Sequence, residues 1–214
     1  MMRNRFDQQL ALLHEKLIAM GALCEDGIFA SMRALAEDAE AIERTKQIER
    51  ENDAAEREIE NLCMKLLLQQ QPVARDLRAI SSALKMISDM ERIGDQAADI
   101  AEITRYLPHE ILEKALPLHH MAKAAAKMVT DSVDSFVKGD LSIAKQVQQE
   151  DDRVDALFEA VKSDLIEQIR QDPASGQACL DLLMIAKYLE RIGDHAVNIS
   201  EWVEYALTGV HLKE

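Results

Sequence analysis

Eight carboxylates in this chain have a spacing that suits the binding of metal ions. They form four pairs in which a Glu or Asp precedes an Asp by four residues: Glu49 and Asp53, Glu91 and Asp95, Asp151 and Asp155, Glu190 and Asp194. Residues four apart lie on the same side of a helix, so each pair would direct two carboxylates the same way. Sites built from carboxylates alone suit Mg²⁺, Mn²⁺, Ca²⁺ or iron and disfavour structural zinc. The spacing therefore predicts divalent or iron-type metal ions with oxygen ligands.

Two of the pairs belong to a repeated pentapeptide, Glu-Arg-Ile-Gly-Asp. The copies, Glu91–Asp95 and Glu190–Asp194, are separated by 99 residues in a chain of 214. Other positions match at the same offset: Ile100 with Ile199, Glu102 with Glu201, and Asp99 with Asn198. A repeat of this period indicates two copies of one structural unit, which we expect to cover residues 1–107 and 108–214.

Both pentapeptides lie among apolar residues at helical spacing, so their acids fall along the apolar stripe of an amphipathic helix. Charged groups there cost free energy unless they are paired or bound to metal. Arg92 and Arg191 each follow the Glu of the motif, but one residue is about 100° of helical rotation, so we expect both to point away from it. We favour a metal ion over the alternative, which is pairing with Lys or Arg of a neighbouring helix.

The elements that must position these acids are helices. Ten methionines with only 4% aromatic residues suit helical cores, and 48% hydrophobic residues exclude general disorder. Four prolines mark helix boundaries, and Gly139-Asp140 combines a helix-ending glycine with a helix-capping aspartate. The expected helices cover residues 6–37, 41–70, 74–106, 117–138, 141–170 and 176–208. The predicted fold class is all-α, with two tandem pseudo-symmetric three-helix bundles (six helices) joined by Tyr106–Pro117.

The second and third helices of an antiparallel bundle are neighbours, so their acids can converge on one ion. Asp53 and Glu91 lie 19 residues before and after Pro72, which places them at the same level. The acid spacing pairs Glu49 with Asp151. These two residues are separated by three residues more than the 99-residue offset of the pentapeptides, so an insertion of three residues would reconcile the two halves. Glu49 and Asp53 lie toward the edge of the apolar face, and a solvated charged helix is the alternative for them.

Several functional classes have little support in the sequence. A formal net charge of −14, without a basic stripe, excludes nucleic acid as a partner. There is no glycine-rich phosphate loop and no Ser-His-Asp arrangement, so we expect no enzymatic activity. His195 lies about 100° around the helix from Asp194, and we expect a surface or boundary residue rather than a ligand.

The cysteines and the apolar segments indicate a cytoplasmic protein. Cys24, Cys63 and Cys179 are an odd number without Cys-x-x-Cys spacing, so we interpret them as reduced core residues. The first residues have no apolar core of a secretory leader, and no apolar stretch approaches eighteen residues. We therefore expect a cytoplasmic location.

Three segments together resemble the PhoU family of phosphate-transport accessory proteins: Gln71–Arg78 (Gln-Pro-Val-Ala-Arg-Asp-Leu-Arg), Met90–Asp95 and Leu189–His195. The resemblance covers essentially the whole chain. It implies two similar three-helix bundles, and metal ions or clusters bound through the four acid pairs given above. Asn198 occupies the position that corresponds to Asp99 in the first half. The second site would then have one negative charge fewer, so the two sites are expected to differ in affinity.

The resemblance also implies a function. PhoU proteins are negative regulators of the phosphate-starvation response and of high-affinity phosphate uptake, and they link the ATPase of the phosphate ABC transporter to a sensor histidine kinase. This chain would then be a homodimer held at the membrane by its partners. The alternative is a metal-carboxylate enzyme or a metal-storage bundle. The di-iron bundles among these carry a Glu-x-x-His element, which this sequence lacks.

Overall fold

The computed structural model describes residues 2–35, 38–69, 73–108 and 116–210. Within these ranges the chain forms six α-helices and one short 3-10 helix, without strands, which confirms the predicted fold class. The elements are α1 (Met2–Leu35), α2 (Ala39–Gln69), α3 (Ala74–Thr104), α5 (Leu116–Lys138), α6 (Leu141–Gln171), η1 (Pro173–Ser175) and α7 (Gly176–Thr208). Most ends lie within two residues of the predicted ones, although α1 begins at Met2 rather than at residue 6. Most of the predicted link Tyr106–Pro117 lies outside the described residues.

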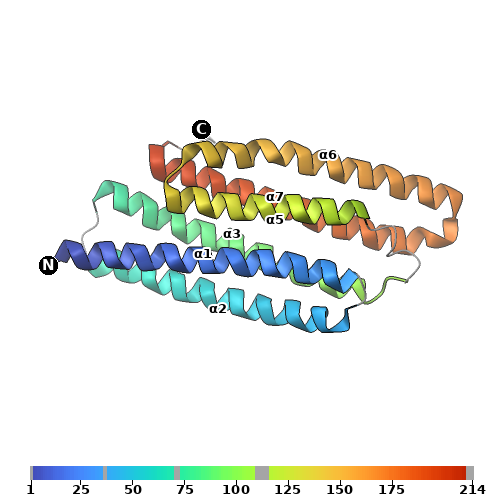
Figure 1. The fold of residues 1–214 in the computed structure, drawn as a ribbon, viewed down its shortest axis with the longest axis horizontal. Helices are drawn as coiled ribbons and strands as arrows, with labels where there is room; N and C mark the ends of the chain where they lie inside the picture. Colours follow the sequence, from blue (N-terminus) through green and yellow to red (C-terminus); the bar gives the residue numbers. More distant parts are fainter. Residues whose placement is uncertain (1, 36–37, 70–72, 109–115, 211–214) are drawn as a thin grey trace.

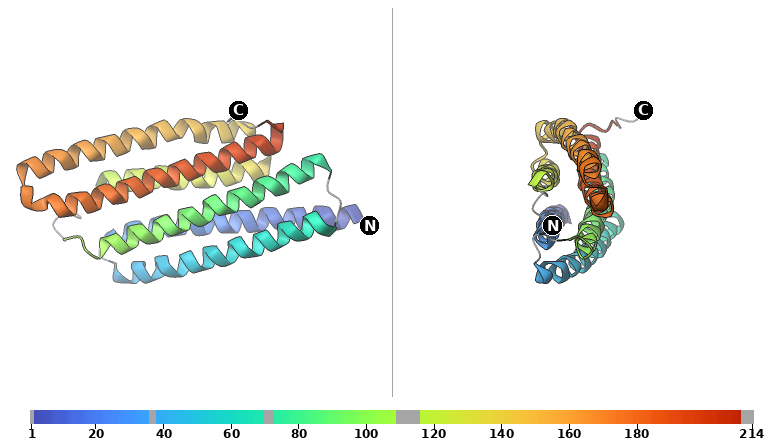
Figure 2. Two further views of the ribbon diagram at one scale, coloured as in Figure 1. Left: turned by 180° about the vertical axis from the view of Figure 1, so that it is seen from behind. Right: turned by 90° about the vertical axis from the view of Figure 1, so that its right-hand side faces the viewer.

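The two halves, α1–α3 and α5–α7, lie side by side rather than end to end (Figure 1). Helices α3 and α7 form the most extensive contact between any two elements, and α1 also contacts α5. Seen end-on, α2, α3, α7 and α6 form a curved row, and α1 and α5 lie against its inner side (Figure 2). This order places α3 and α7, which carry the repeated pentapeptide, at the centre of the molecule.

One apolar cluster connects all six helices. Its fully buried members include Leu17 of α1, Met90 of α3, Val129 of α5 and Leu189 of α7. Burying a side chain of this size contributes about 1.5–3 kcal/mol, so helices with a continuous apolar stripe gain most by facing one another. Cys24, Cys63 and Cys179 are buried and unpaired, as predicted. The halves therefore share one core.

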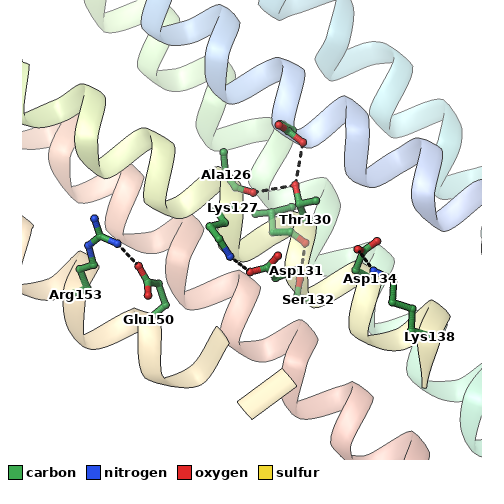
Figure 3. A network of polar contacts seen from close by, with 11 residues as sticks. Ala126, Lys127, Thr130, Asp131, Ser132, Asp134, Lys138, Glu150 and Arg153 are labelled. Atoms are coloured by element: carbon green, nitrogen blue, oxygen red, sulfur yellow. Dashed lines mark hydrogen bonds and ion pairs between the residues drawn. The ribbon is translucent and has the colours of Figure 1, made fainter. Parts of the chain in front are cut away.

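Turns and surface pairs follow the local sequence. Gly139 ends α5 with a φ of 64°, and the Asp140 carboxylate accepts a hydrogen bond from the Ser142 backbone N–H at 2.9 Å, as the Gly-Asp pair predicted. On α5, Lys127 pairs with Asp131 along the exposed face (Figure 3). Pairs of this kind contribute only about 0.2–0.5 kcal/mol each, so these charges mainly keep the outer surface solvated.

A polar contact supplements the apolar packing between α1 and α5. The Thr130 hydroxyl donates a hydrogen bond to Glu25 Oε2 at 2.9 Å and lies 3.2 Å from the backbone carbonyl oxygen of Ala126 (Figure 3).

Among the described helices, none is both long enough and apolar enough to span a membrane.

Candidate functional site

The glycine of each pentapeptide lets the neighbouring helix approach closely. A Cβ atom added to Gly94 of α3 would lie 2.6 Å from Asn52 Nδ2 of α2, and one added to Gly193 of α7 would lie 3.3 Å from Asp151 Oδ1 of α6. A glycine inside a helix costs about 1 kcal/mol relative to alanine, and here it creates room for a polar side chain of the facing helix. The glycine therefore fixes where α2 meets α3 and where α6 meets α7.

These contacts also set the register between the halves. The Cβ position of Gly193 also faces Val154 Cγ1 at 3.6 Å, and Asn52 and Val154 are 102 residues apart. Helices α2 (Ala39–Gln69) and α6 (Leu141–Gln171) differ by 102 residues at both ends. Beyond the effect of burial, the charge of Asp53 raises the pKa of Asp95, as the charge of Asp155 raises that of Asp194. The second helices are therefore offset by three residues more than the pentapeptides, as the predicted insertion requires.

The first centre lies between α2 and α3. Three carboxylate oxygens, one each from Asp53, Glu91 and Asp95, lie within 4.8 Å of one another. Asp53 and Glu91 are therefore neighbours, as counting residues from Pro72 predicted. The side chains are part-buried, with 39%, 25% and 37% of their surfaces exposed. Three acids at this distance repel each other and form a compact set of oxygen ligands.

Electrostatic coupling extends this centre in both directions along α2. Burial raises the pKa of Glu49, and the charges of Asp95 and Asp53 raise it further. Burial also raises the pKa of Glu56, which in turn raises that of Glu91. Glu56 lies outside the predicted pairs, although its place one turn after Asp53 is visible in the sequence. Glu49 and Glu56 therefore join Asp53, Glu91 and Asp95 in the first centre, and Asp99 lies close enough to raise the pKa of Glu49 and Asp95.

Arg92 is closer to this centre than the sequence predicted. Its Nε lies 3.5 Å from Glu91 Oε2 and its Nη1 lies 3.6 Å from Asp95 Oδ2. The expectation that Arg92 points away is therefore wrong, because a long flexible side chain can bend back along the helix surface. Arg57 adds a second guanidinium 3.9 Å from Asp53 Oδ2. These cations partly neutralise the first centre, and Arg92 lowers the pKa of Asp95 against the effect of burial.

The second centre lies between α6 and α7. Burial raises the pKa of Asp151 to about 6, and the charges of Asp155, Asp194 and Glu190 contribute to the increase. Burial and Glu190 likewise raise the pKa of Asp194. These couplings place the four predicted acids of the second half near one another, although among the described residues only the first half has three carboxylate oxygens within 4.8 Å of one another. Lys187, one turn before Glu190, forms an ion pair with it.

The residues present fit hard metal ions. Asp151 Oδ1 is fully buried, and within the described part of the chain it has no hydrogen-bond partner. A buried, unpaired carboxylate oxygen is costly, and a cation would offset that cost. All candidate ligands in both centres are carboxylates, which suits Mg²⁺, Mn²⁺, Ca²⁺ or iron. When bound, such an ion would supply positive charge that holds the two facing helices together.

A polar seam between α3 and α7 separates the two centres. Asp89 Oδ1 lies 2.8 Å from His195 Nδ1 and accepts a hydrogen bond from Asn198 Nδ2 at 3.2 Å. Burial raises the pKa of Tyr188, and the neighbouring Asp99 carboxylate raises it further. His195 is therefore a boundary residue, as predicted. Asp89 and Tyr188 are not among the site residues predicted from the sequence, although the repeat offset of 99 relates them to each other.

The fold and the two centres define a class of protein: tandem three-helix bundles with an acidic cluster between the second and third helices of each half. The chain belongs to the PhoU family, because the family model described as PhoU domain matches residues 17–104 and 118–203. The matched segments contain both pentapeptides and all eight predicted acids.

Relatives and solved structures agree over nearly the whole chain. A protein of Clostridium acetobutylicum named phosphate-specific transport system accessory protein PhoU homolog is 35% identical, with 98% of this chain and 97% of the relative covered. A protein of the same name from Pseudomonas aeruginosa is 32% identical, with 98% and 88% covered. The crystal structure of PhoU from Pseudomonas aeruginosa superposes with a TM-score of 0.86 at 31% identity, covering 96% of this chain and all of that one.

The phosphate transport system regulatory protein PhoU from Streptococcus pneumoniae has the same fold. Its crystal structure gives a TM-score of 0.88 at 29% identity and covers 98% of this chain and 100% of that chain. Family membership supports a role for this chain as an accessory or regulatory protein of phosphate transport.

Proposed function

We propose that this chain is a negative regulator of the phosphate-starvation response and of high-affinity phosphate uptake. The observation that carries the proposal is the match of both halves to the PhoU domain, together with relatives named as accessory proteins of the phosphate-specific transport system. The repeat units would be residues 1–107 and 108–214, each containing one of the matched segments.

The protein would act as a cytoplasmic adaptor. Its partners would be the ATPase of a phosphate ABC transporter and a sensor histidine kinase, and the working form would be a homodimer. The acids of the pentapeptides are committed to the grooves between helices, which leaves the outer faces of the helices for partners. We propose no catalytic role, and phosphatase and ferroxidase assays on metal-loaded protein should give no turnover.

Each half would hold metal between its second and third helices. The proposed ligands are Glu49, Asp53, Glu91 and Asp95 in the first centre, and Asp151, Asp155, Glu190 and Asp194 in the second. The compact set of oxygens from Asp53, Glu91 and Asp95 supports the first, and the unpaired buried oxygen of Asp151 supports the second. Glu56 joins the first centre because it couples to Glu91.

A deletion strain tests the regulatory role. Removing the gene should leave phosphate-starvation genes switched on in phosphate-rich medium, as measured with a reporter, and the intact gene should restore repression. Normal repression in a deletion strain without a second copy of the gene would contradict the proposal. The adaptor role is tested separately by pull-down, where binding to neither the transporter ATPase nor the kinase would contradict it.

A further inference from the structure

The first helices of the two halves differ in length, whereas the second helices match. Helix α1 has 34 residues and α5 has 23, but α2 and α6 have 31 each. The last residues of α1 and α5, Leu35 and Lys138, are 103 residues apart, close to the 102-residue offset of α2 and α6. Helix α5 is therefore shorter at its start, by about 16 Å of helix, and Figure 1 shows α6 and α7 extending beyond it.

In the first half, the additional turns of α1 cover the end of α2. Lys16 of α1 pairs with Glu58 of α2 at 2.9 Å, so the turns before Lys16 lie beside the residues that follow Glu58. These turns place Phe6 in the core at 6% exposure, and Leu10 packs against the same cluster. The end of α2 contributes four side chains that are at most 7% exposed: Ile59, Leu62, Cys63 and Leu66.

The corresponding end of the second half contains a cavity. Its volume is about 200 Å³, and it lies among α5, α6 and α7. The four positions of α6 that correspond to the end of α2 at the 102-residue offset all line it: Val161, Asp164, Leu165 and Gln168. Leu62 and Leu66 of the first half are thus replaced by Asp164 and Gln168 where α5 lacks the covering turns.

The cavity combines apolar walls with two polar groups. The apolar walls are formed by side chains that are at most 8% exposed: Leu118, Val161, Leu165 and Leu182. Asp164 is exposed and Gln168 is half-buried, and within the described ranges neither side chain forms a hydrogen bond or an ion pair. The nearby cations on α6 are engaged elsewhere, because Lys162 pairs with Glu159 and Arg170 with Glu167.

We propose that this cavity binds a small organic ammonium ligand. Its apolar body would occupy the space that the turns of α1 fill in the first half. Its ammonium group would pair with the Asp164 carboxylate and donate a hydrogen bond to the Gln168 side-chain oxygen. An anionic ligand would be repelled by Asp164. Sites for drug-sized molecules have at least about 300 Å³, so this ligand should be about the size of one ring with a short arm.

The inference goes beyond the proposed function and does not rest on it. Asp155, the nearest acid of the second centre along α6, precedes Asp164 by nine residues, which is about 13 Å of helix. A ligand in the cavity would contact α5, α6 and α7 together and would hold the start of α5 in place.

Titration of the full chain with benzylamine and with benzyl alcohol tests the proposal. The two probes share one ring, but only the amine is positively charged at pH 7. In methyl NMR spectra, the ring should shift the signals of Leu118, Val161, Leu165 and Leu182 and leave those of Ile59 and Leu66 in the first half unchanged. Benzylamine should bind about fivefold more tightly than benzyl alcohol, as one solvent-accessible ion pair allows.

Two variants separate the charge from the cavity. Asp164→Asn keeps the shape of an exposed side chain and should remove the preference for the amine, whereas Glu167→Gln on the same helix should retain it. Val161→Phe should fill the cavity and abolish the methyl shifts with both probes. If that variant does not fold, Asp164→Asn still decides. No shift at the four wall residues, equal affinity of wild type for both probes, or an undiminished preference in Asp164→Asn would overturn the proposal.

Discussion

Asn198 of α7 donates a hydrogen bond to Asp89 of α3, and the positions related to them by the repeat are also neighbours, because the Asp99 carboxylate raises the pKa of Tyr188 beyond the effect of burial. Both pairs join α3 to α7, so the seam has an internal two-fold relationship although its four residues differ. The chemistry of the two ends is unequal, because only the end at Asp89 also includes His195.

Replacing Asp89 with alanine should lower the stability of the protein. The substitution leaves His195 and Asn198 without their shared acceptor in a part-buried seam. Losing such a partner costs about 1–3 kcal/mol, and urea unfolding would measure the loss. Asp164→Ala on α6 is the matched control and should stay within about 0.5 kcal/mol of wild type. An equally small change for Asp89→Ala would show that the seam does not stabilise the fold.

The pentapeptide glycines should tolerate alanine unequally. At Gly94 the added Cβ would lie 2.6 Å from Asn52 Nδ2, which is hydrogen-bonded in place, so we expect a loss of about 1–3 kcal/mol. At Gly193 the nearest atom is 3.3 Å away, and the loss should be smaller. Gly176, which has nothing within 4 Å, should gain slightly from the helix propensity of alanine. Thermal unfolding of the three variants should rank them in this order.

Metal-free protein should lose stability as the pH rises through the range in which Asp151 ionises. The folded state raises the pKa of this carboxyl from 3.8 to about 6, so the native state holds its proton more tightly than the unfolded chain does. The favourable contribution is complete below pH 4 and is lost as the pH passes 6. Asp151→Asn mimics the protonated form and should therefore be more stable than wild type at pH 7.5.

The gain for Asp151→Asn should be about 1 kcal/mol after allowance for solvent screening, and it should vanish at pH 4. Urea unfolding of chelated protein at both pH values measures it. Glu91 lies in the other half and is present in both proteins, so its effect cancels in the comparison, whereas Asp194 couples to Asp151 and contributes to the difference. A gain of the same size at both pH values would point to packing instead of charge.

Metal binding should stabilise the protein against heat. A ligand at one hundred times its Kd adds about 2.7 kcal/mol per site, which corresponds to several degrees in Tm for a chain of this size. Mn²⁺ should therefore raise the Tm of chelated wild type and leave the Glu91→Gln/Glu190→Gln double variant nearly unchanged. Scanning calorimetry with and without chelator measures both. An equal Tm increase in the double variant would place the stabilising ions elsewhere.

The sequence was sufficient to predict the helices and the acid pairs, because both depend on spacing along one helix. Proline positions and apolar periodicity set the helix ends, and counting from Pro72 placed Asp53 beside Glu91. What depends on a second helix was predicted less well. The contacts of Asn52 with Gly94 and of Val154 with Gly193 are set by the close approach of two helices, and spacing within one helix cannot reveal them.

Side-chain reach was the other source of error. Helical rotation gives the direction of the Cβ atom of Arg92, but the guanidinium lies at the end of a long flexible chain and returns to Glu91 and Asp95. Contacts between the halves, such as Asp89 with Asn198, required knowing that α3 packs on α7.

The packing of α3 on α7 is that of a symmetric dimer whose two subunits have been fused into one polypeptide. In a true homodimer, every substitution appears on both sides of the axis at once, so a change must suit two sites together. Fusion removes that constraint. Asp89 and Tyr188 could diverge, as could Asp99 and Asn198, and one surface could become two with different chemistry. A repeat within one chain thus lets this protein have two copies of one surface that differ in their residues.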